Sequence, residues 1–483
     1  MGANSITSEA NGPLGNATIA IVLGDASTVA STYGGAGPNA VLLVTGANNT
    51  NVQNFSINRN IDSSAAANVV GRNDIGYANN NTGAQGTLTI SSNWALSTGA
   101  TRGDGLWAQQ AAQILDFTGA IMGGNAAARF RVGDFGQGVG TVRLSNALNT
   151  YAGDTAVVTG TLLIAGDAGA ASGVLGTNTT LRLAEGGNAT PNNTALIDGA
   201  FTVGKTISLE NGATPTSTWT LGGNQAVASS FTGNVNTVSN ANSRTLKLSQ
   251  ASGGTVSFTG VIGANPDATG TTSIEKTGAG TAVLTNDNTY DGTTTVSNGT
   301  LKLNRGAADN TTILTDNNTA TTSDIVINGG SLEIAASEQI ADSGSINMSS
   351  GSLGFGAASG LTESIDKLTV SGGTFATGAN QLIVGGATVT WSGGTNTIST
   401  GGLVSDKHWV ITGGTNTVQL NGLLRVQSSV NTPNGLIFGG TSSPTITQDS
   451  DSTNPGQILL KQNVTVDATL TSGTAQILSA GSG

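Results

Sequence analysis

The chain has no cysteine, a single histidine, 8 prolines and few charged or aromatic residues, which make up 9 % and 4 % of its 483 residues. Without cysteine it can form neither disulfides nor thiolate zinc sites, and no cysteine can act as a nucleophile. The scarcity of charge argues against ordinary disorder, because disordered chains combine high charge with low hydrophobicity. No apolar run approaches the ~20 residues that a membrane-spanning helix needs. The lack of cysteine fits passage through an oxidising compartment, and it fits equally a fold of thin coils that has no use for thiols.

Glycine, by contrast, is abundant, with 72 residues. Each interior glycine destabilises a helix by roughly 0.5–1 kcal/mol, so the composition excludes a helical protein. The glycines follow no three-residue period, which excludes collagen. The formal net charge is −11 with only 17 Lys and Arg, so no basic surface for phosphates is available. We therefore expect a β-rich scaffold with neither a nucleic-acid partner nor a membrane span.

Short segments that alternate polar and apolar residues recur along the chain, for example at 180–183, 245–248 and 300–303. Alternation of this kind predicts a strand with one buried and one solvated face. Gly or Asn commonly flanks the segments, so each strand is expected to be short and to end at a turn.

The spacing of the turns is more informative than the strands themselves. A Gly followed by Ser or Thr recurs at Gly330, Gly351, Gly373, Gly394 and Gly414, with successive spacings of 21, 22, 21 and 20 residues. An antiparallel sandwich does not need such a register, whereas a solenoid does, since each coil contacts its neighbours. The spacing predicts an all-β fold, a parallel β-helix (β-solenoid) with about 20–22 residues and three short strands per coil.

This register predicts which residues stack on one another. Ser331-Leu332, Ser352-Leu353, Thr374-Phe375 and Thr395-Asn396 are expected to occupy equivalent places in successive coils. The two leucines and the phenylalanine would then point inward as an apolar ladder. Asn396 and Asn416 would either form a polar ladder or mark a shift of register.

The composition predicts that the chain has two regions. Residues 1–85 form an N-terminal Asn/Gly-rich β region that is irregular or capping, and residues 86–483 form the solenoid. Within the solenoid, the Gln- and Ala-rich segment 109–113 is the best candidate for a short helix or an insertion.

Two longer units, near 117–162 and 258–303, share a common pattern. In the second unit, KTGAGT at 276–281 precedes NTYDG at 288–292 and GTL at 299–301. The first unit repeats the later part of the pattern and lacks the Lys-Thr-Gly portion. In both units the final Leu follows the Asn by 13 positions.

The pattern resembles the autotransporter passenger-associated strand repeat of Gram-negative secreted proteins. The resemblance implies a right-handed parallel β-helix that is exported to the cell surface or the extracellular space of a Gram-negative bacterium. It implies no catalysis, because the repeat is structural in its family. We expect the tyrosines to cap a coil corner and the glycines beside them to permit a tight backbone. The structural repeat residues are Gly280, Asn288, Tyr290, Gly292, Gly299 and Leu301 in the second unit, and Asn149, Tyr151, Gly153, Gly160 and Leu162 in the first.

The sequence departs from that family at both ends. We expect the chain to lack the family's C-terminal membrane barrel and the amphipathic cap that such solenoids often carry. Residues 1–5 lack the basic segment of a secretion signal, so a mature or trimmed chain is expected.

Few residues are candidates for catalysis. His408, the only histidine, has no Gly-x-Ser-x-Gly elbow to accompany it and is expected to be a surface or packing residue. Asp449 and Asp451, or Asp287 and Asp291, could supply the two opposed carboxylates of a glycoside hydrolase. The same carboxylates could bind Ca²⁺, although no calcium-binding repeat is present. Solvated turn carboxylates are the favoured interpretation, so we expect no catalytic residue, cofactor or metal.

An Arg-Gly-Asp tripeptide, Arg102-Gly103-Asp104, is a weak adhesion candidate of the integrin-binding type. In a sequence so rich in glycine, chance occurrence is the favoured explanation.

Three hypotheses of function follow. The first is a non-catalytic extracellular structural or adhesive protein, a β-solenoid that self-associates head to tail or laterally into a fibre or surface layer. Its partners would be further copies of itself and a host or neighbouring-cell surface. The second is a polysaccharide-active β-helix enzyme, and the third is a trimmed passenger of a longer autotransporter adhesin.

Overall fold

A computed structural model describes the fold of most of the region from residue 86 to residue 397 and of single strands on either side. The described residues are 21–22, 40–45, 55–57, 60–62, 73–78, 86–96, 98, 103–133, 138–184, 192–210, 218–237, 244–263, 271–306, 324–385, 389–393, 395–397, 403–405, 409–411, 417–419, 424–426, 436–438, 445–447, 457–460 and 476–479.

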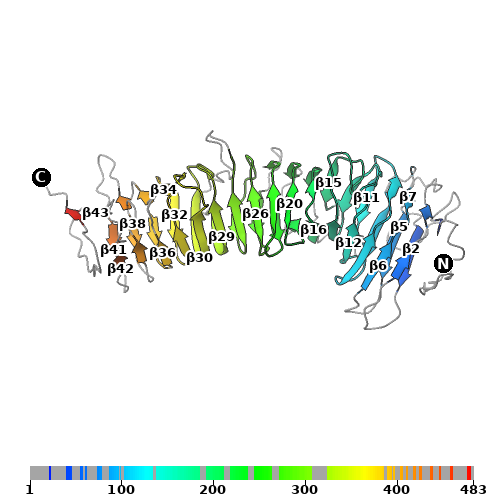
Figure 1. Ribbon diagram of the computed structural model, residues 1–483, viewed down its shortest axis with the longest axis horizontal. Coiled ribbons are helices and arrows are strands. Elements are labelled where there is room, and N and C mark those ends of the chain that lie inside the picture. Colours follow the sequence, from blue (N-terminus) through cyan, green and yellow to red (C-terminus); the bar gives the residue numbers. More distant parts are fainter. Residues whose placement is uncertain are drawn as a thin grey trace. The chain divides into compact units, whose positions relative to one another are not determined.

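Every described element is a β-strand. Within each part of the chain, the strands of successive coils lie side by side and run in the same direction (Figure 1). The chain divides into two compact units, of which unit 1 comprises residues 1–247 and 254–270, and unit 2 comprises 248–253 and 271–483. One strand, β22 (Arg244–Gln250), contributes residues to both units.

Unit 1 contains parallel stacks of strands in which each strand pairs with the next coil. One short sheet joins β1 (Ile21–Val22), β4 (Ile61–Asp62), β7 (Trp94–Leu96) and β10 (Ile121–Gly123). A second joins β2 (Ala40–Thr45), β5 (Asn73–Ala78), β8 (Gly105–Ala108), β11 (Arg129–Val132), β13 (Asp154–Val157), β15 (Thr180–Leu183), β18 (Thr206–Leu209), β21 (Val235–Thr237) and β24 (Ile262–Gly263).

The third stack of unit 1 joins β3 (Phe55–Ile57), β6 (Gly86–Ile90), β9 (Gln113–Phe117), β12 (Thr141–Leu144), β14 (Gly160–Ile164), β16 (Asn192–Ile197) and β19 (Thr218–Gly223). Beside it run β17 (Thr202–Val203), β20 (Ala228–Phe231) and β23 (Thr255–Phe258).

Unit 2 has the same organisation. One stack joins β25 (Thr272–Lys276), β27 (Thr294–Val296), β29 (Ile325–Ile334), β30 (Ser345–Phe355), β32 (Lys367–Val370), β35 (Val389–Trp391), β38 (Trp409–Ile411) and β41 (Leu436–Phe438). Another joins β26 (Thr281–Leu284) and β28 (Thr300–Leu303) through β29 and β30 to β33 (Thr374–Ala376) and β36 (Thr395–Thr397).

The remaining strands of unit 2 form two further sheets. The larger joins β31 (Thr362–Ile365), β34 (Gln381–Val384), β37 (Leu403–Ser405), β40 (Leu424–Val426), β43 (Gln457–Leu460) and β44 (Gln476–Ser479). The smaller pairs β39 (Thr417–Gln419) with β42 (Thr445–Thr447).

The described strands of these sheets pair in parallel, which confirms the predicted parallel β-solenoid. The predicted stacking is confirmed residue by residue, because Leu332 pairs with Leu353, Leu353 with Phe375, and Phe375 with Asn396. Leu332, Leu353 and Phe375 are buried, so they form the expected inward ladder. Asn416 lies outside the described residues.

Coil length is less uniform than predicted. The 21-residue register holds between Ser331 and Ser352, whose hydroxyls are 2.8 Å apart. In unit 1, Asp116 and Arg143 are neighbours across coils although they are 27 residues apart in sequence. Between these two residues the chain forms β10, a turn at 124–128 and β11. Turns between strands tolerate such differences in length.

Of the two alternatives expected for 109–113, a short helix or an insertion, the helix is wrong. Residues 109–112 form a turn between β8 and β9, and Gln113 is the first residue of β9. Five residues are too few for a stable helix, since helix nucleation is unfavourable. Pairing of β9 with strands on both sides decides the conformation instead.

The core of each unit is a column of apolar side chains. In unit 1, Leu88, Leu115, Val142 and Leu162 stack in register, and all four are buried. Parallel coils thereby bury apolar area against both neighbours, and burial stabilises by about 25 cal/mol per Å² of apolar surface.

Aromatic side chains pack against one another in the core of unit 1. The Phe130 ring lies 4.6 Å from Tyr151 and 6.0 Å from Trp94, centroid to centroid. Phe231 stacks on its register partner Phe258 at 5.3 Å. Although aromatic residues make up only 4 % of the chain, these rings lie in contact with one another.

Candidate functional site: the stacked repeat corners

The tyrosines of the two predicted repeat units occupy the same environment. Tyr151 and Tyr290 are fully buried, and each hydroxyl lies 2.7 Å from the hydroxyl of the threonine four residues later, Thr155 or Thr294. Burial raises the pKa of both phenols above the ordinary range, although the threonine hydrogen bond acts in the opposite direction. Each tyrosine therefore fills the interior of a corner as a neutral group with a partnered hydroxyl.

The asparagines two residues earlier are buried as well. Asn149 Oδ1 accepts the backbone N–H of Ile121 at 2.8 Å, and its Nδ2 donates to the carbonyl of Val174 at 2.7 Å. These two bonds join the coil of Asn149 to the coils on either side. Asn288 is buried at the equivalent position of the second unit.

The glycines after the tyrosines lie against the backbone of the neighbouring coil. A methyl group at Gly153 would overlap the carbonyl oxygen of Ala128, and one at Gly292 would overlap the Ser273 hydroxyl and lie 2.6 Å from the Thr272 carbonyl. The coils can therefore approach closely at this corner only where no side chain intervenes.

The second pair of glycines adopts left-handed backbone conformations. Gly160 has φ of +74° and Gly299 has φ of +61°. A Cβ would overlap the carbonyl oxygen of Gly140 in the first case and those of Gly278 and Gly280 in the second. The conformation and the close approach both require glycine here.

The leucines that close each unit belong to the core columns. Leu162 pairs with Val142, and Leu301 pairs with both Ala282 and Leu332. Both leucines are fully buried. Gly280 accepts the N–H of Thr300 at 3.1 Å, which connects the first and last parts of the second repeat.

Lys276 has a role that sequence reasoning missed. It is fully buried, and its ammonium donates to the carbonyl oxygens of Gly278 and, at 3.1 Å, Asn298. A side chain at Gly299 would approach the Lys276 Nζ to 2.7 Å. The Lys-Thr-Gly portion thus supplies a buried cation that joins two coils, and burial lowers the pKa of Lys276 to about 8.

A second buried lysine serves a loop of unit 1. The Nζ of Lys205 contacts the carbonyls of Gly176 at 2.8 Å and of Asn178. Burial lowers its pKa to about 8, against the opposing effect of Asp154. In the sequence, the only hint of this role is that the lysine lies among hydrophobic residues and glycines. No motif or spacing distinguishes it from a surface lysine.

The few outward charges of unit 1 lie in alternating sign across coils. Arg143 bonds Asp198 at 2.8 Å through Nε and Asp116 at 3.2 Å through Nη1. Although burial alone would raise the pKa of Asp198, hydrogen bonds from Arg143, Asn224 and Gln225 lower it below its ordinary value. Identical coils would stack like charges above one another, and these would repel. Because the signs alternate here, neighbouring coils attract instead.

A second network follows the same rule. Arg182 pairs with Asp154 at 2.6 Å and also with Glu210, and Glu210 accepts from Arg129 at 2.9 Å. In unit 2, Lys302 pairs with its register neighbour Glu333 at 2.7 Å.

The candidate catalytic carboxylates have structural partners. Asp287 pairs with Arg305 at 2.8 Å, and Asp291 accepts the N–H of Thr272 at 2.7 Å. Asp449, Asp451 and His408 lie outside the described residues. In the part of the chain that the structure describes, no group of three His, Asp or Glu side chains could hold a metal ion.

The adhesion tripeptide is only partly described, because Arg102 lies outside the described residues. Asp104 is 3 % exposed, and Gly103 has φ of +75° against the backbone of Arg129. A carboxylate must be accessible to meet a receptor, so the burial of Asp104 weighs against this candidate.

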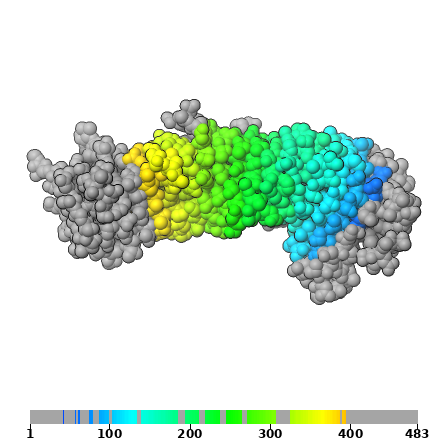
Figure 2. Space-filling model, viewed as in Figure 1, coloured from blue at the N-terminus to red at the C-terminus, as the bar shows by residue number. Residues whose placement is uncertain are grey.

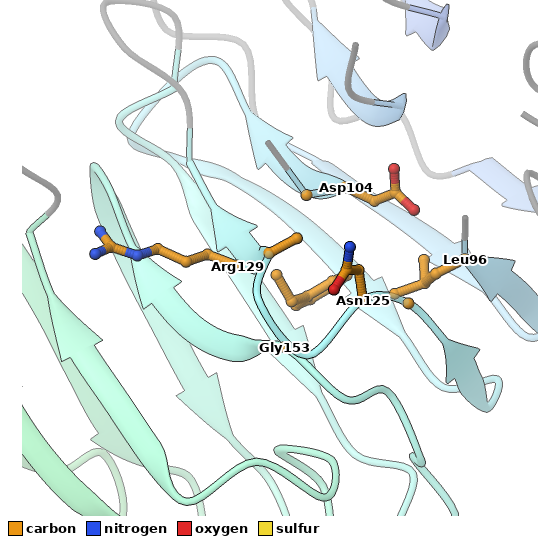
Figure 3. Close-up of a pocket in the computed structure, with 9 residues that line it drawn as sticks. Leu96, Asp104, Asn125, Arg129 and Gly153 are labelled. Carbon is orange, nitrogen blue, oxygen red and sulfur yellow. The ribbon is translucent and has the colours of Figure 1, made fainter. Parts of the chain in front are cut away.

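Asp104 lines a small hollow of unit 1 together with Leu96, Asn125 and Gly153 (Figure 3). Its volume of about 10 Å³ is that of roughly one water molecule. The Arg129 side chain extends away from the hollow in Figure 3 and reaches Glu210. The hollow therefore offers no room for a substrate or cofactor.

Among the residues that the structure describes, there is no helix long and apolar enough to cross a membrane.

Comparison with protein-family models gives two matches to the passenger-associated transport repeat, at residues 137–164 and 274–303. These matches contain all the structural repeat residues and lie within or overlap the units predicted near 117–162 and 258–303. The comparisons with curated proteins and with solved structures found no match. The resemblance inferred from the sequence is confirmed at both units.

Proposed function

With two passenger-associated transport repeats built into a parallel β-solenoid as the premise, we propose that this chain is a non-catalytic extracellular passenger with a structural or adhesive role on the surface of a Gram-negative bacterium. The repeat matches carry the proposal, since the repeat family is named for passenger transport. The repeat residues described above serve packing and hydrogen bonding within a corner, or close approach and hydrogen bonding between coils.

The described surface supports a structural role. The outward column of unit 2 stacks hydroxyl side chains in register, namely Thr281, Thr300, Ser331, Ser352 and Thr374. The two carboxylates beside the second repeat already have partners, since Asp287 pairs with Arg305 and Asp291 accepts the backbone N–H of Thr272. Figure 2 shows closely packed atoms over the described coils on the face in view, without the deep groove that a polysaccharide enzyme needs.

Self-association is the second part of the proposal. The terminal strand of any parallel stack leaves backbone N–H and C=O groups unpaired, and pairing with another copy satisfies them. The hydroxyl column offers a lateral alternative. The adhesive partner in either case is a host or neighbouring-cell surface.

Sedimentation velocity over a concentration series, followed by electron microscopy of the same samples, tests self-association. We expect species larger than the monomer that increase with concentration and appear as filaments or sheets. Thr300→Lys with Ser352→Lys adds two like charges to the hydroxyl column, so it should abolish lateral sheets and leave end-to-end filaments. A chain that stays monomeric at every concentration contradicts self-association.

A further inference from the structure

The chain contains six Asn-Gly pairs, and the structure describes two of them, Asn298-Gly299 and Asn328-Gly329. An asparagine before glycine loses its side-chain amide readily, because the glycine nitrogen can attack the side-chain carbonyl carbon without hindrance from a Cβ. Both asparagines are exposed. They lie at one corner in successive coils of unit 2, since a Cβ at Gly330 would lie 3.0 Å from the Asn298 nitrogen. The two pairs therefore offer the same chemistry in two backbone settings.

The side chain of Asn298 is folded back onto the peptide group that follows it. The Gly299 N–H donates to Asn298 Oδ1 at 2.8 Å. Because the Cγ–Oδ1 bond is about 1.23 Å long, the Gly299 nitrogen lies within about 4 Å of Asn298 Cγ. A small rotation of the side chain brings the two atoms into reacting geometry. Asn328, by contrast, lies inside β29 and pairs with Ser350 of β30, and a strand directs its side chains away from the backbone.

Lys276 binds the carbonyl oxygen of the same peptide group. Its fully buried ammonium donates to the Asn298 carbonyl oxygen at 3.1 Å. The nitrogen of this peptide group is that of Gly299, which must lose its proton before it can act as a nucleophile. A charged donor on the carbonyl oxygen withdraws electron density from the peptide group and makes its N–H more acidic. The lysine that joins two coils therefore favours the attack on Asn298.

The first repeat has a threonine at this place. Thr159 precedes the left-handed Gly160, and its hydroxyl donates to the carbonyl oxygen of Gly138. In the second repeat the lysine ammonium binds the corresponding carbonyl oxygen, that of Gly278. The lysine takes over this contact, so residue 298 does not need a hydroxyl. The asparagine there gives the second repeat a reactive amide in place of the threonine.

We propose that Asn298 is a self-modification site, at which the Gly299 nitrogen displaces the side-chain amide and water then leaves aspartate or isoaspartate in the second repeat. The Gly299 nitrogen loses its proton and forms a bond to Asn298 Cγ. The Cγ–Nδ2 bond breaks, and the amide group leaves with that proton as ammonia. Water opens the cyclic imide at Cγ to give aspartate, or at the former backbone carbonyl to give isoaspartate. The reaction requires water alone and does not depend on the proposed surface role.

The modification changes the contact between two coils. Either product places a carboxylate beside the Lys276 ammonium, which in the unmodified chain binds a neutral carbonyl. Isoaspartate also lengthens the backbone by one atom immediately before Gly299. A Cβ on this glycine would overlap the carbonyl oxygen of Gly278, so the corner has little room for a longer backbone.

Peptide mapping of the full chain by mass spectrometry tests the proposal, after incubation in neutral buffer with and without denaturant. Dividing the rate in the folded chain by the rate of the same asparagine in denaturant removes the influence of the neighbouring sequence. This ratio should be at least unity for Asn298 and about tenfold lower for Asn328. Slower loss of the Asn298 amide in the folded chain than in denaturant overturns the proposal.

Two further measurements identify the route. Only the imide gives isoaspartate beside aspartate, so electron-transfer fragmentation of the 298 peptide should show both products, and aspartate alone would contradict the attack by Gly299. Asn298→Thr, which copies Thr159 of the first repeat, should give no mass change at this peptide. Its Asn328 peptide should behave as in the wild type.

The role of the lysine has its own variant. Lys276→Met removes the charged donor and should lower the Asn298 ratio, and an unchanged ratio in a folded variant would contradict activation by Lys276. If this variant does not fold, the wild-type ratio and the isoaspartate product decide the proposal.

Discussion

At the scale of single residues, the glycine register has a direct physical cause. In unit 2 a methyl group at Gly351 would overlap the carbonyl oxygen of Gly330, and one at Gly373 would lie 2.6 Å from the carbonyl oxygen of Gly351. Gly351 and Gly373 also have φ of +85° and +90°. Gly351 and Gly373, two of the glycines that repeat along the sequence, are therefore points where the backbone of one coil touches that of the next.

Gly351→Ala should destabilise unit 2 by more than about 1 kcal/mol, because it combines a left-handed backbone with a carbonyl overlap. Chemical denaturation gives the change in the free energy of unfolding. Two matched controls separate the causes. Gly360 has φ of +78° with open space around it, so Gly360→Ala reports the backbone cost alone. Gly385 has open space and no left-handed φ, so Gly385→Ala should change stability by less than about 0.5 kcal/mol. Equal effects of all three substitutions would contradict the explanation.

The tyrosine–threonine pairs give a second prediction at this scale. Tyr290→Phe removes one partner of a fully buried hydroxyl pair and should cost about 1–3 kcal/mol, because the Thr294 hydroxyl loses its partner. The double variant Tyr290→Phe with Thr294→Val should lose less than the sum of the single changes. Additive losses in this double-mutant cycle would show that the two hydroxyls are not coupled.

At the scale of elements, the sequence predicts the strands and their register well where coil length is constant. The stack from Leu332 to Asn396 follows from the 21-residue spacing alone. Prediction fails where tertiary pairing decides, as at 109–113, where flanking coils convert a Gln/Ala segment into a turn. It also misses the buried polar groups, because Lys276, Lys205 and Glu363 have ordinary sequence surroundings and acquire partners only when distant coils stack.

Lys276, which joins two coils in the second repeat, should make the free energy of unfolding of unit 2 depend on pH in the alkaline range. Lys276 in the folded chain has its pKa lowered to about 8, whereas the unfolded chain holds the proton up to its ordinary value of 10.5. Between these values the unfolded state binds more protons, so the stability of unit 2 should rise with pH. Lys276→Met should remove this contribution, as measured by denaturation at pH 8, 9 and 10. A wild-type slope equal to that of the variant would contradict the buried-lysine assignment.

At the scale of the whole molecule, composition and arrangement agree. The chain has a net charge of −11 and only 17 Lys and Arg, and in unit 1 Arg143 and Arg182 each lie between two carboxylates. Buried positions hold aliphatic ladders, aromatic stacks and hydrogen-bonded amides, together with the two buried lysines Lys205 and Lys276. The described contacts therefore hold neighbouring coils together. Such an arrangement suits the proposed display or assembly role outside the cell.

Accessibility of the chain on intact cells tests this account most directly. The complete gene product, expressed in a Gram-negative bacterium, is labelled on unpermeabilised cells with an antibody to the described coils and then exposed to external protease. A periplasmic and a cytoplasmic protein serve as controls for leakage. The account predicts strong labelling of the chain, and cleavage or release of it, while both controls stay intact. A chain that is labelled and cleaved only after the cells are permeabilised would contradict the surface role.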